Sequence, residues 1–323
     1  MKILVTGGAG FIGSHLVDAL IEKGHKIIVV DSLIEGRVEN IQHQIDSGKC
    51  VFIKADIRDA EFILNKLEPC DMIYHMAADP DVRSSVPKPM VSYDHNMNGT
   101  MNILEYMRKH NIKKMVFASS GGTVYGEVEE SRFPVTEEFP LFPISPYGAS
   151  KAAAEMYMNA YANAYETKIA SVRYANIFGE RSTHGVGFDF YMKLTKNPKQ
   201  LEILGDGMQQ KSYLHISDCI AATVLVGESL DTQKKPYEYY NVGSEEWYTV
   251  RELAKIYEDA MGLKDVEHVF TGGTRGWVGD VAKMLTSIEK IKTLGYSPKV
   301  PYPEGVKKYV KWIQQNFDKL QKH

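Results

Sequence analysis

Tyr147 and Lys151 have the residue types and the spacing to remove a proton from an alcohol. They form a Y-x-x-x-K pair in a segment predicted to begin a helix, so the phenol and the ammonium lie on one face about one turn apart. A free tyrosine has a pKa near ~10, and a cation ~4 Å away at an effective dielectric of ~20 is worth ~4 kcal/mol. That energy predicts a phenol with a pKa near ~7, which is suited to general base catalysis. Taken alone, the spacing is more typical of an ordinary helix, so the rest of the chain has to support the interpretation.

A glycine-rich turn near the N-terminus predicts a dinucleotide site. The β-branched run Lys2–Thr6 predicts a buried strand, a G-x-x-G-x-x-G turn runs from Gly7 to Gly13, and Ser14–Lys23 is amphipathic. Such glycines let the backbone approach a pyrophosphate. The N-terminus of the following helix offers free N–H groups and the positive end of its dipole.

Asp31 predicts which dinucleotide binds. It ends a second predicted strand, Lys26–Val30. An acidic residue at this place binds the adenosine ribose diol and repels a 2′-phosphate, which favours NAD over NADP. Arg37 is close enough in sequence to leave NADP open.

Composition excludes several other classes of protein. The chain has 323 residues, of which 44% are hydrophobic and 24% charged, enough for a large core. A net charge of −3 gives no electrostatic case for nucleic-acid binding. We predict no signal peptide, and no apolar run approaches the ~20 residues that a membrane span needs. Cys50, Cys70 and Cys219 have neither metal nor redox spacing. We therefore expect a cytoplasmic protein without a metal and without a nucleic-acid or membrane partner.

Further motifs occur in one order along nearly the whole chain. Together with the glycine-rich turn and the Y-x-x-x-K pair, they resemble the extended, nucleotide-sugar branch of the short-chain dehydrogenase/reductase superfamily. Within it the chain is similar to the NAD-dependent epimerase/dehydratase family, most of all to the UDP-glucose 4-epimerases. The motifs are D-I-R from Asp56, H-M-A-A from His75, N-M-N-G-T from Asn96, V-F-A-S-S from Val116, T-V-Y-G from Thr123 and R-Y-A-N-I-F-G from Arg173.

The alternating strand and helix patterns and the resemblance predict an α/β fold. We expect a doubly wound parallel sheet of the Rossmann type, with NAD bound by residues 1–173. Residues 174–323 are expected to form a smaller α/β lobe that mainly binds the nucleotide sugar, with helices near 249–261 and 306–320. The ligand cleft is expected at the carboxyl ends of the strands.

The resemblance implies residues for the cofactor and for catalysis. Tyr147 is the expected base, and Lys151 is expected to lower its pKa and to hold the nicotinamide ribose. The catalytic Ser or Thr of most relatives corresponds to Gly121 here, so the hydroxyl comes from Ser120 or Thr123, or the role is lost. The residues implied for NAD are Gly7, Gly10, Phe11, Ile12, Gly13, Asp31, Ser32, Asp56, Ile57, Ala77, Ala78, Asn96, Ser119, Tyr147, Lys151 and Tyr174.

Differences from the family patterns narrow the substrate. Dehydratases and decarboxylases of this branch carry an acidic residue where this chain has Thr123. Uronate epimerases hold the carboxylate of the sugar with a Thr and an Arg, and the matching positions in this chain are Asn176 and Thr183. Arg181 is the one arginine that remains close to these positions in the sequence. Burying a carboxylate without a cation is costly, so a neutral sugar is favoured. Lys211 replaces a family Arg, which keeps the charge but loses bidentate phosphate geometry. The residues implied for the substrate are Arg83, Ser120, Asn176, Lys211, Tyr213, Arg275 and Asp280.

The resemblance therefore implies an isomerase. We expect an NAD-dependent 4-epimerase that interconverts UDP-glucose and UDP-galactose through a transient 4-keto sugar. The alternatives are a 4-epimerase of UDP-N-acetylhexosamine or of a UDP-uronate, a nucleotide-sugar dehydratase or reductase, and a non-catalytic NAD-binding protein.

An apolar helix face predicts the assembly. Ala149, Ala153, Met156 and Ala160 lie opposite the face of Tyr147 and Lys151. The family commonly pairs this helix and the one after Asn96 with a second copy, so we expect a homodimer. Burial within one subunit is the alternative.

Overall fold

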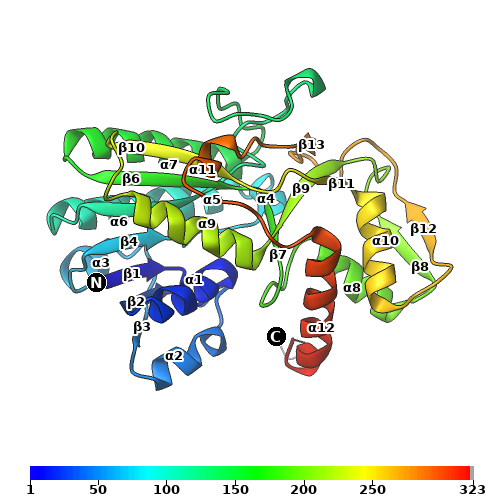
Figure 1. Cartoon of the computed structure of the whole chain (residues 1–323), viewed down its shortest axis with the longest axis horizontal. Helices are drawn as coiled ribbons and strands as arrows, with labels where there is room; N and C mark the ends of the chain where they lie inside the picture. The colour runs from blue at the N-terminus through cyan, green and yellow to red at the C-terminus, as the bar shows by residue number, and fades with distance from the viewer. Residues whose placement is uncertain (321–323) are drawn as a thin grey trace.

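The large sheet of the protein is parallel throughout. The computed structural model describes residues 1–320 and contains a seven-stranded sheet in the order β10-β6-β5-β4-β1-β2-β3 (Figure 1). The order reverses between β1 and β4, which places a crevice at the carboxyl ends of the strands. The predicted doubly wound sheet is confirmed. Its strands are β1 (Lys2–Thr6), β2 (Lys26–Asp31), β3 (Cys50–Lys54), β4 (Met72–His75), β5 (Lys114–Ser120), β6 (Lys168–Tyr174) and β10 (Tyr237–Val242).

Both faces of this sheet are covered by helices. The side chains of β1 are buried on alternate faces, because Ile3 and Val5 belong to one apolar cluster and Leu4 to another. Apolar side chains on both faces are typical of strands in parallel sheets. Helices α1 (Phe11–Glu22) and α9 (Ile216–Ser229) cover the first face. The second face is covered by α3 (Ala60–Asn65), α6 (Gly99–Lys109) and α7 (Pro146–Ala164).

Local sequence explains where α7 begins. The Ser145 hydroxyl accepts a hydrogen bond from the Gly148 amide at 3.1 Å, and Pro146 occupies the first helical position. A serine cap followed by proline is a favourable helix start, because the serine satisfies an orphan N–H and proline has none to satisfy. The start places Tyr147 and Lys151 in the first two turns.

A smaller lobe holds a separate apolar core. A four-stranded sheet consists of β7 (Asn176–Phe178), β9 (Gln210–His215), β11 (Trp247–Thr249) and β13 (Lys283–Met284), and β8 (Gln200–Ile203) pairs with β12 (Glu267–Phe270). Helices α8 (Val186–Lys196), α10 (Val250–Met261) and α12 (Tyr302–Leu320) pack around this lobe, at the right of Figure 1. The two helices predicted for this region are confirmed, although α12 begins four residues earlier than predicted.

The chain passes between the lobes more than once. β10 and α9 lie beyond residue 173 and yet complete the large sheet and its cover. The assignment of NAD to residues 1–173 and of the substrate mainly to residues 174–323 stays a prediction. Within residues 1–320, no helix combines the length and the apolar character that crossing a membrane requires. The short elements are η1 (Val38–Asn40), α2 (Gln42–Asp46), α4 (Val82–Ser85), α5 (Pro89–Ser92), η2 (Tyr93–Asn98), η3 (Glu130–Arg132) and α11 (Glu289–Lys292).

Candidate active site

A cavity of about 460 Å³ lies at the carboxyl ends of the central strands. All the predicted cofactor residues except Asn96 line it. Asn96 is instead buried beside it, where its side chain accepts a hydrogen bond from the Asp79 amide at 2.8 Å and donates one to Ser150 Oγ at 3.0 Å. Asn96 therefore supports the loop that carries Asp79.

The glycine-rich turn is too crowded for side chains. Gly7 has a φ of +68°, and a Cβ on Gly13 would lie 2.1 Å from the Gly7 carbonyl oxygen. No side chain caps the N-terminus of α1, so its first amides remain available to a ligand. This cradle suits a phosphate group that approaches the backbone closely.

Asp31 is fixed at the end of β2 beside this turn. Its carboxylate accepts hydrogen bonds from the Leu33 amide at 2.8 Å and from the Ala9 amide at 3.0 Å. Burial raises the pKa of Asp31, while those backbone hydrogen bonds lower it. A Cβ on Gly36 would lie 2.6 Å from Asp31 Oδ1, so Gly36 lets the next loop close over the carboxylate.

Lys151 is buried at the other end of the cavity. The residue is only 3% exposed, and its Nζ donates a hydrogen bond to the Ala118 carbonyl oxygen at 2.8 Å. Burial lowers the pKa of Lys151 to about 8, although the carboxylates of Asp79 and Glu155 act in the opposite direction. The ammonium thus carries its charge at neutral pH.

Tyr147 differs from the sequence prediction in its pKa. Burial raises the pKa of the phenol to about 12, a hydrogen bond with Ser120 lowers it, and Asp79 raises it. Lys151 Nζ lies 5.9 Å from the centre of the Tyr147 ring and is directed at the Ala118 carbonyl. The pKa near ~7 that the spacing predicts is therefore wrong for this structure, because burial raises the pKa of the phenol and the Lys151 ammonium is directed at another acceptor.

The hydroxyl near Tyr147 comes from Ser120. Thr123 Oγ1 donates a hydrogen bond to Ser120 Oγ at 2.8 Å, and Ser120 lies close enough to Tyr147 to lower the pKa of its phenol. A Cβ on Gly121 would lie 2.9 Å from the Arg173 carbonyl oxygen, which is closer than normal packing allows. The backbone here leaves no room for the Ser or Thr that most relatives carry at this position.

Apart from Ser120, which lies next to Tyr147, the predicted substrate residues are away from the cavity lining. Asn176 on β7 is paired in register with Tyr213 on the adjacent strand β9, and Tyr213 is buried. Lys211 Nζ, also on β9, lies 2.5 Å from Asp280 Oδ1. The structure thus places all four residues in the smaller lobe and pairs the side chains of Lys211 and Asp280.

The two predicted arginines lie elsewhere. Arg83 is exposed on α4, and Arg275 forms a half-exposed ion pair with Glu127 at 3.1 Å. Neither lines the cavity. Their roles in substrate binding stay predictions.

Four charged residues that line the cavity are not among the predicted site residues: Glu35, Arg37, Asp79 and Arg181. Asp79 follows the H-x-A-A motif directly, and its carboxylate affects the pKa of both Tyr147 and Lys151. Arg181 lies two residues after the R-Y-x-N-x-x-G motif, and its Nη2 donates to Asp18 Oδ2 on α1 at 2.7 Å. For Asp79 and Arg181, adjacency to a recognised motif was the available signal. Within the described part of the chain, no three His, Cys, Asp or Glu side chains are placed to hold a metal ion.

Comparison with known proteins identifies the family. The family model described as "NAD dependent epimerase/dehydratase family" matches residues 3–243. The chain belongs to this family. A UDP-glucose 4-epimerase of Mycolicibacterium smegmatis is 33% identical over 320 residues, which cover 97% of this chain and 99% of that protein.

Two solved structures of the same family resemble the whole chain. The UDP-glucose 4-epimerase of Thermotoga maritima with UDP-glucose has a TM-score of 0.89 and 35% identity, covering 98% of this chain and 100% of that one. The UDP-glucose 4-epimerase of Thermus thermophilus in complex with NAD has a TM-score of 0.86 and 34% identity, covering 97% of this chain and 99% of that one.

The residues of this epimerase/dehydratase family member fit NAD. The crowded turn at Gly7 and Gly13 is shaped for a backbone approach to phosphate, and Asp31 is fixed where an adenosine ribose diol would lie. Tyr147 and Lys151 line the same cavity at its other end. The cavity is therefore suited to a dinucleotide with its reactive ring near Tyr147.

Proposed function

We propose that the protein is an NAD-dependent nucleotide-sugar 4-epimerase that interconverts UDP-glucose and UDP-galactose. The observation that carries the proposal is the position of Tyr147, Lys151, Asp31 and the glycine-rich turn around one cavity, in a chain of the epimerase/dehydratase family. The relatives and structures named above are UDP-glucose 4-epimerases, and two of those structures hold UDP-glucose or NAD.

Tyr147 moves the proton in this proposal. It accepts the proton of the sugar 4-hydroxyl, Ser120 positions the same oxygen by a hydrogen bond, and Lys151 holds the nicotinamide ribose. NAD, when bound, supplies a hydride acceptor that later returns the hydride. The 4-keto sugar turns so that C4 receives the hydride on its other face, which inverts C4, and Tyr147 returns the proton to the 4-oxygen.

The pKa of Tyr147 near 12 has a role in this scheme. A phenol whose pKa lies well above neutral pH keeps its proton and loses it only while an additional positive charge is close. The oxidised nicotinamide is such a charge, and Lys151 adds to it. Proton transfer and hydride transfer are thereby coupled at one residue.

The substrate is proposed to carry a neutral sugar. Arg181 is the cation that follows the pocket-entry motif, and it is paired with Asp18. Asn176 and Thr183 are uncharged and cannot neutralise the carboxylate of a uronate sugar. Lys211 is proposed to bind the diphosphate of the substrate, which weakens its ion pair with Asp280.

The proposal is tested by the cofactor and by a substrate panel. The purified protein is denatured and the supernatant assayed for NAD, and UDP-glucose, UDP-N-acetylglucosamine and UDP-glucuronate are then offered to native protein. We expect released NAD and formation of UDP-galactose with no net NADH. Free NADH formed in each turnover indicates a dehydrogenase or reductase, loss of water a dehydratase, and preference for the glucuronate contradicts the neutral-sugar argument.

A homodimer through α6 and α7 is proposed as the assembly. On α7, Met156 and Tyr157 are 55% and 46% exposed, and Ala149 and Ala160 are exposed beside them. Met90 and Tyr93, just before α6, are also exposed. Apolar surface of this kind is favourable to cover with a second copy. Light scattering at micromolar concentration should give twice the mass of the chain.

The cytoplasm is proposed as the location. Cys50, Cys70 and Cys219 are free and buried, a pattern typical of reducing compartments. Fractionation of the native host, followed by detection of the protein, tests this.

A further inference from the structure

A buried ion pair lies beside the cavity without lining it. Glu155, on α7, is 0% exposed, and Arg173, near the end of β6, is 3% exposed. Arg173 Nη2 donates to Glu155 Oε2 at 2.7 Å, and Arg173 Nε donates to Oε1 at 3.0 Å. The guanidinium and the carboxylate are thus joined in the bidentate geometry that fixes orientation most strongly.

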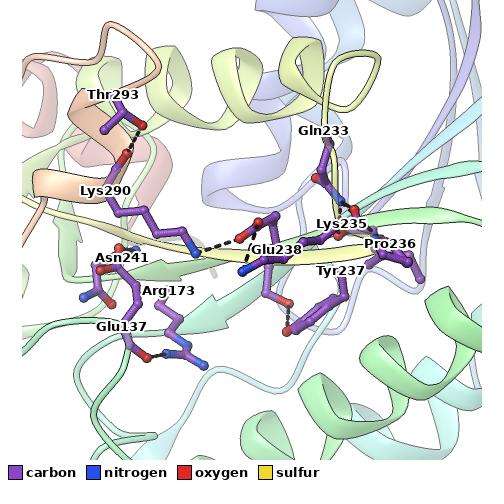
Figure 2. Close-up of polar contacts among 12 residues, drawn as sticks. Glu137, Arg173, Gln233, Lys235, Pro236, Tyr237, Glu238, Asn241, Lys290 and Thr293 are labelled. Atoms are coloured by element: carbon purple, nitrogen blue, oxygen red, sulfur yellow. Dashed lines mark hydrogen bonds and ion pairs between the residues drawn. The ribbon is translucent and has the colours of Figure 1, made fainter.

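Further polar groups complete the surroundings of this pair. Tyr237 OH donates to Glu155 Oε2 at 3.2 Å, and Arg173 Nη1 donates to Tyr125 OH at 2.8 Å. Arg173 Nη1 also donates to the Glu137 carbonyl oxygen at 3.3 Å, and Figure 2 shows Arg173 with Glu137 on one side of β10. Residues from segments that are far apart in the sequence therefore surround the Glu155 carboxylate and the Arg173 guanidinium.

Stability is a weak explanation for such a pair. Removing two charges from water is costly, and replacing a buried ion pair by apolar side chains of similar volume is often neutral or stabilising. A buried pair is better explained where it fixes one arrangement of the elements that carry it.

The ion pair joins α7 to β6, and β6 is the neighbour of β5 in the sheet. Three residues on successive turns of α7 each contact the last residues of β5. Tyr147 lies near Ser120, which lowers the pKa of its phenol, Lys151 Nζ donates to the Ala118 carbonyl at 2.8 Å, and Ser119 Oγ donates to Glu155 Oε1 at 2.5 Å. Tyr147 and Lys151 are the proposed reacting groups. Glu155 is also bound by the guanidinium of Arg173.

We propose that Glu155 and Arg173 are positioning residues for the epimerase reaction. Their bidentate pair joins α7 to β6, and Glu155 is also held by Ser119 on the neighbouring strand β5, so that Tyr147 and Lys151 are placed against the cavity. This inference rests on the proposed function, because the placement is defined relative to NAD and the sugar. Ser119 lines the cavity and is hydrogen-bonded to Glu155, so it links the buried ion pair to the cavity wall.

The decisive variant replaces both charges at once, Glu155→Met with Arg173→Met. The two tyrosine hydroxyls next to the pair keep other partners, because Tyr125 OH donates to Asn241 Oδ1 at 2.7 Å and Tyr237 OH shares a hydrogen bond with Ser171 Oγ at 2.7 Å. The double variant is therefore expected to fold. A displacement of ~1 Å at reacting groups lowers rates by up to ~100-fold.

Two readouts separate positioning from a purely structural role. We expect kcat of the double variant to fall about 10- to 100-fold while KM for UDP-glucose changes less than about twofold. We also expect the phenol titration of Tyr147, measured by ultraviolet difference absorbance against Tyr147→Phe in the same background, to shift. A folded double variant with unchanged kcat and unchanged Tyr147 titration overturns the proposal.

A single variant tests the inference if the double variant does not fold. Ser119→Ala removes the contact between Glu155 and β5 while Arg173 still pairs with Glu155. It should shift the Tyr147 titration and lower kcat, and a wild-type result in both measurements overturns the proposal.

The matched control is Glu258→Gln. Glu258, on α10, is a buried carboxylate that lies 2.5 Å from His268 in the smaller lobe. This change should lower the melting temperature and leave the Tyr147 titration unaltered. If wild-type protein epimerises no sugar of the panel, the proposed function fails, whereas the titration still tests the positioning role by itself.

Discussion

At the scale of single residues, the environment of Tyr147 decides its chemistry. Its side chain shares a cavity with Lys151, but burial holds its pKa near 12. The phenol is thus a poor base until a cation is added beside it. Lys151 keeps its charge at neutral pH because its pKa of about 8 still exceeds 7.

Replacing the base should abolish most turnover. Tyr147→Phe removes the oxygen that moves the proton, so we expect kcat for UDP-glucose to fall by ~100- to 10,000-fold while bound NAD is retained. Tyr165→Phe, at a half-exposed position just after the end of the same helix, is the matched control and should behave as wild type. Full turnover by Tyr147→Phe would show that another group is the base.

The pKa of Lys151 predicts how activity responds to alkali. The lysine loses its proton as pH rises through about 8, so we expect kcat/KM for UDP-glucose to decline above that pH. The stability effect has the opposite sign. Because the pKa is lowered from 10.5 in the folded state, the unfolded chain binds more protons between pH 8 and 10.5, and this residue makes stability rise with pH there. Lys151→Met should flatten that rise in melting temperature, and an unchanged slope would contradict the assignment.

At the scale of elements, α7 has two different faces. One face carries Tyr147, Lys151 and Glu155 against β5, and the other leaves Met156 and Tyr157 exposed. The first face follows from a spacing of four residues, which returns side chains to the same side of a helix. The second face is the surface we assign to the partner copy.

A charge on the outer face of α7 should prevent dimer formation. Met156→Glu introduces a carboxylate in the proposed interface, where it has to be desolvated, so we expect monomers at micromolar concentration. Val269→Glu changes an exposed apolar side chain on β12 and should leave the mass unaltered. A Met156→Glu protein that stays dimeric places the interface elsewhere.

At the scale of the whole molecule, we predict that the two lobes bind different ligands. The glycine-rich turn and the large sheet form the cavity. In the smaller lobe, outside the cavity lining, Lys211 pairs with Asp280 and Asn176 donates to the Ser212 carbonyl. In a dinucleotide-binding fold, ligands meet at the carboxyl ends of the strands, which is the edge between the lobes. Substrate affinity and cofactor affinity should therefore be separable by mutation.

A change in the smaller lobe should affect the substrate alone. A hydrogen bond to a charged group contributes ~1.5–3 kcal/mol, so we expect Lys211→Met to raise KM for UDP-glucose by ~10- to 100-fold. The amount of NAD that purifies with the protein should not change. Lys196→Met, at the exposed end of α8, is the matched control. Loss of NAD from Lys211→Met would mean that the lobes do not divide these roles.

Local patterns in the sequence determined the first two strands of the sheet, the glycine-rich turn, the acidic residue at the end of β2 and the Tyr147–Lys151 pair, whereas the place of β10 in the sheet was not predicted. Each depends on the period of a strand or a helix, or on the backbone freedom of glycine, and these act over a few neighbouring residues. Only the tertiary structure decided the raised pKa of Tyr147, the lack of room at Gly121, and the pairing of Glu155 with Arg173. Those properties arise from desolvation and from contacts between segments that are distant in the chain, and both are set only once the strand order is formed.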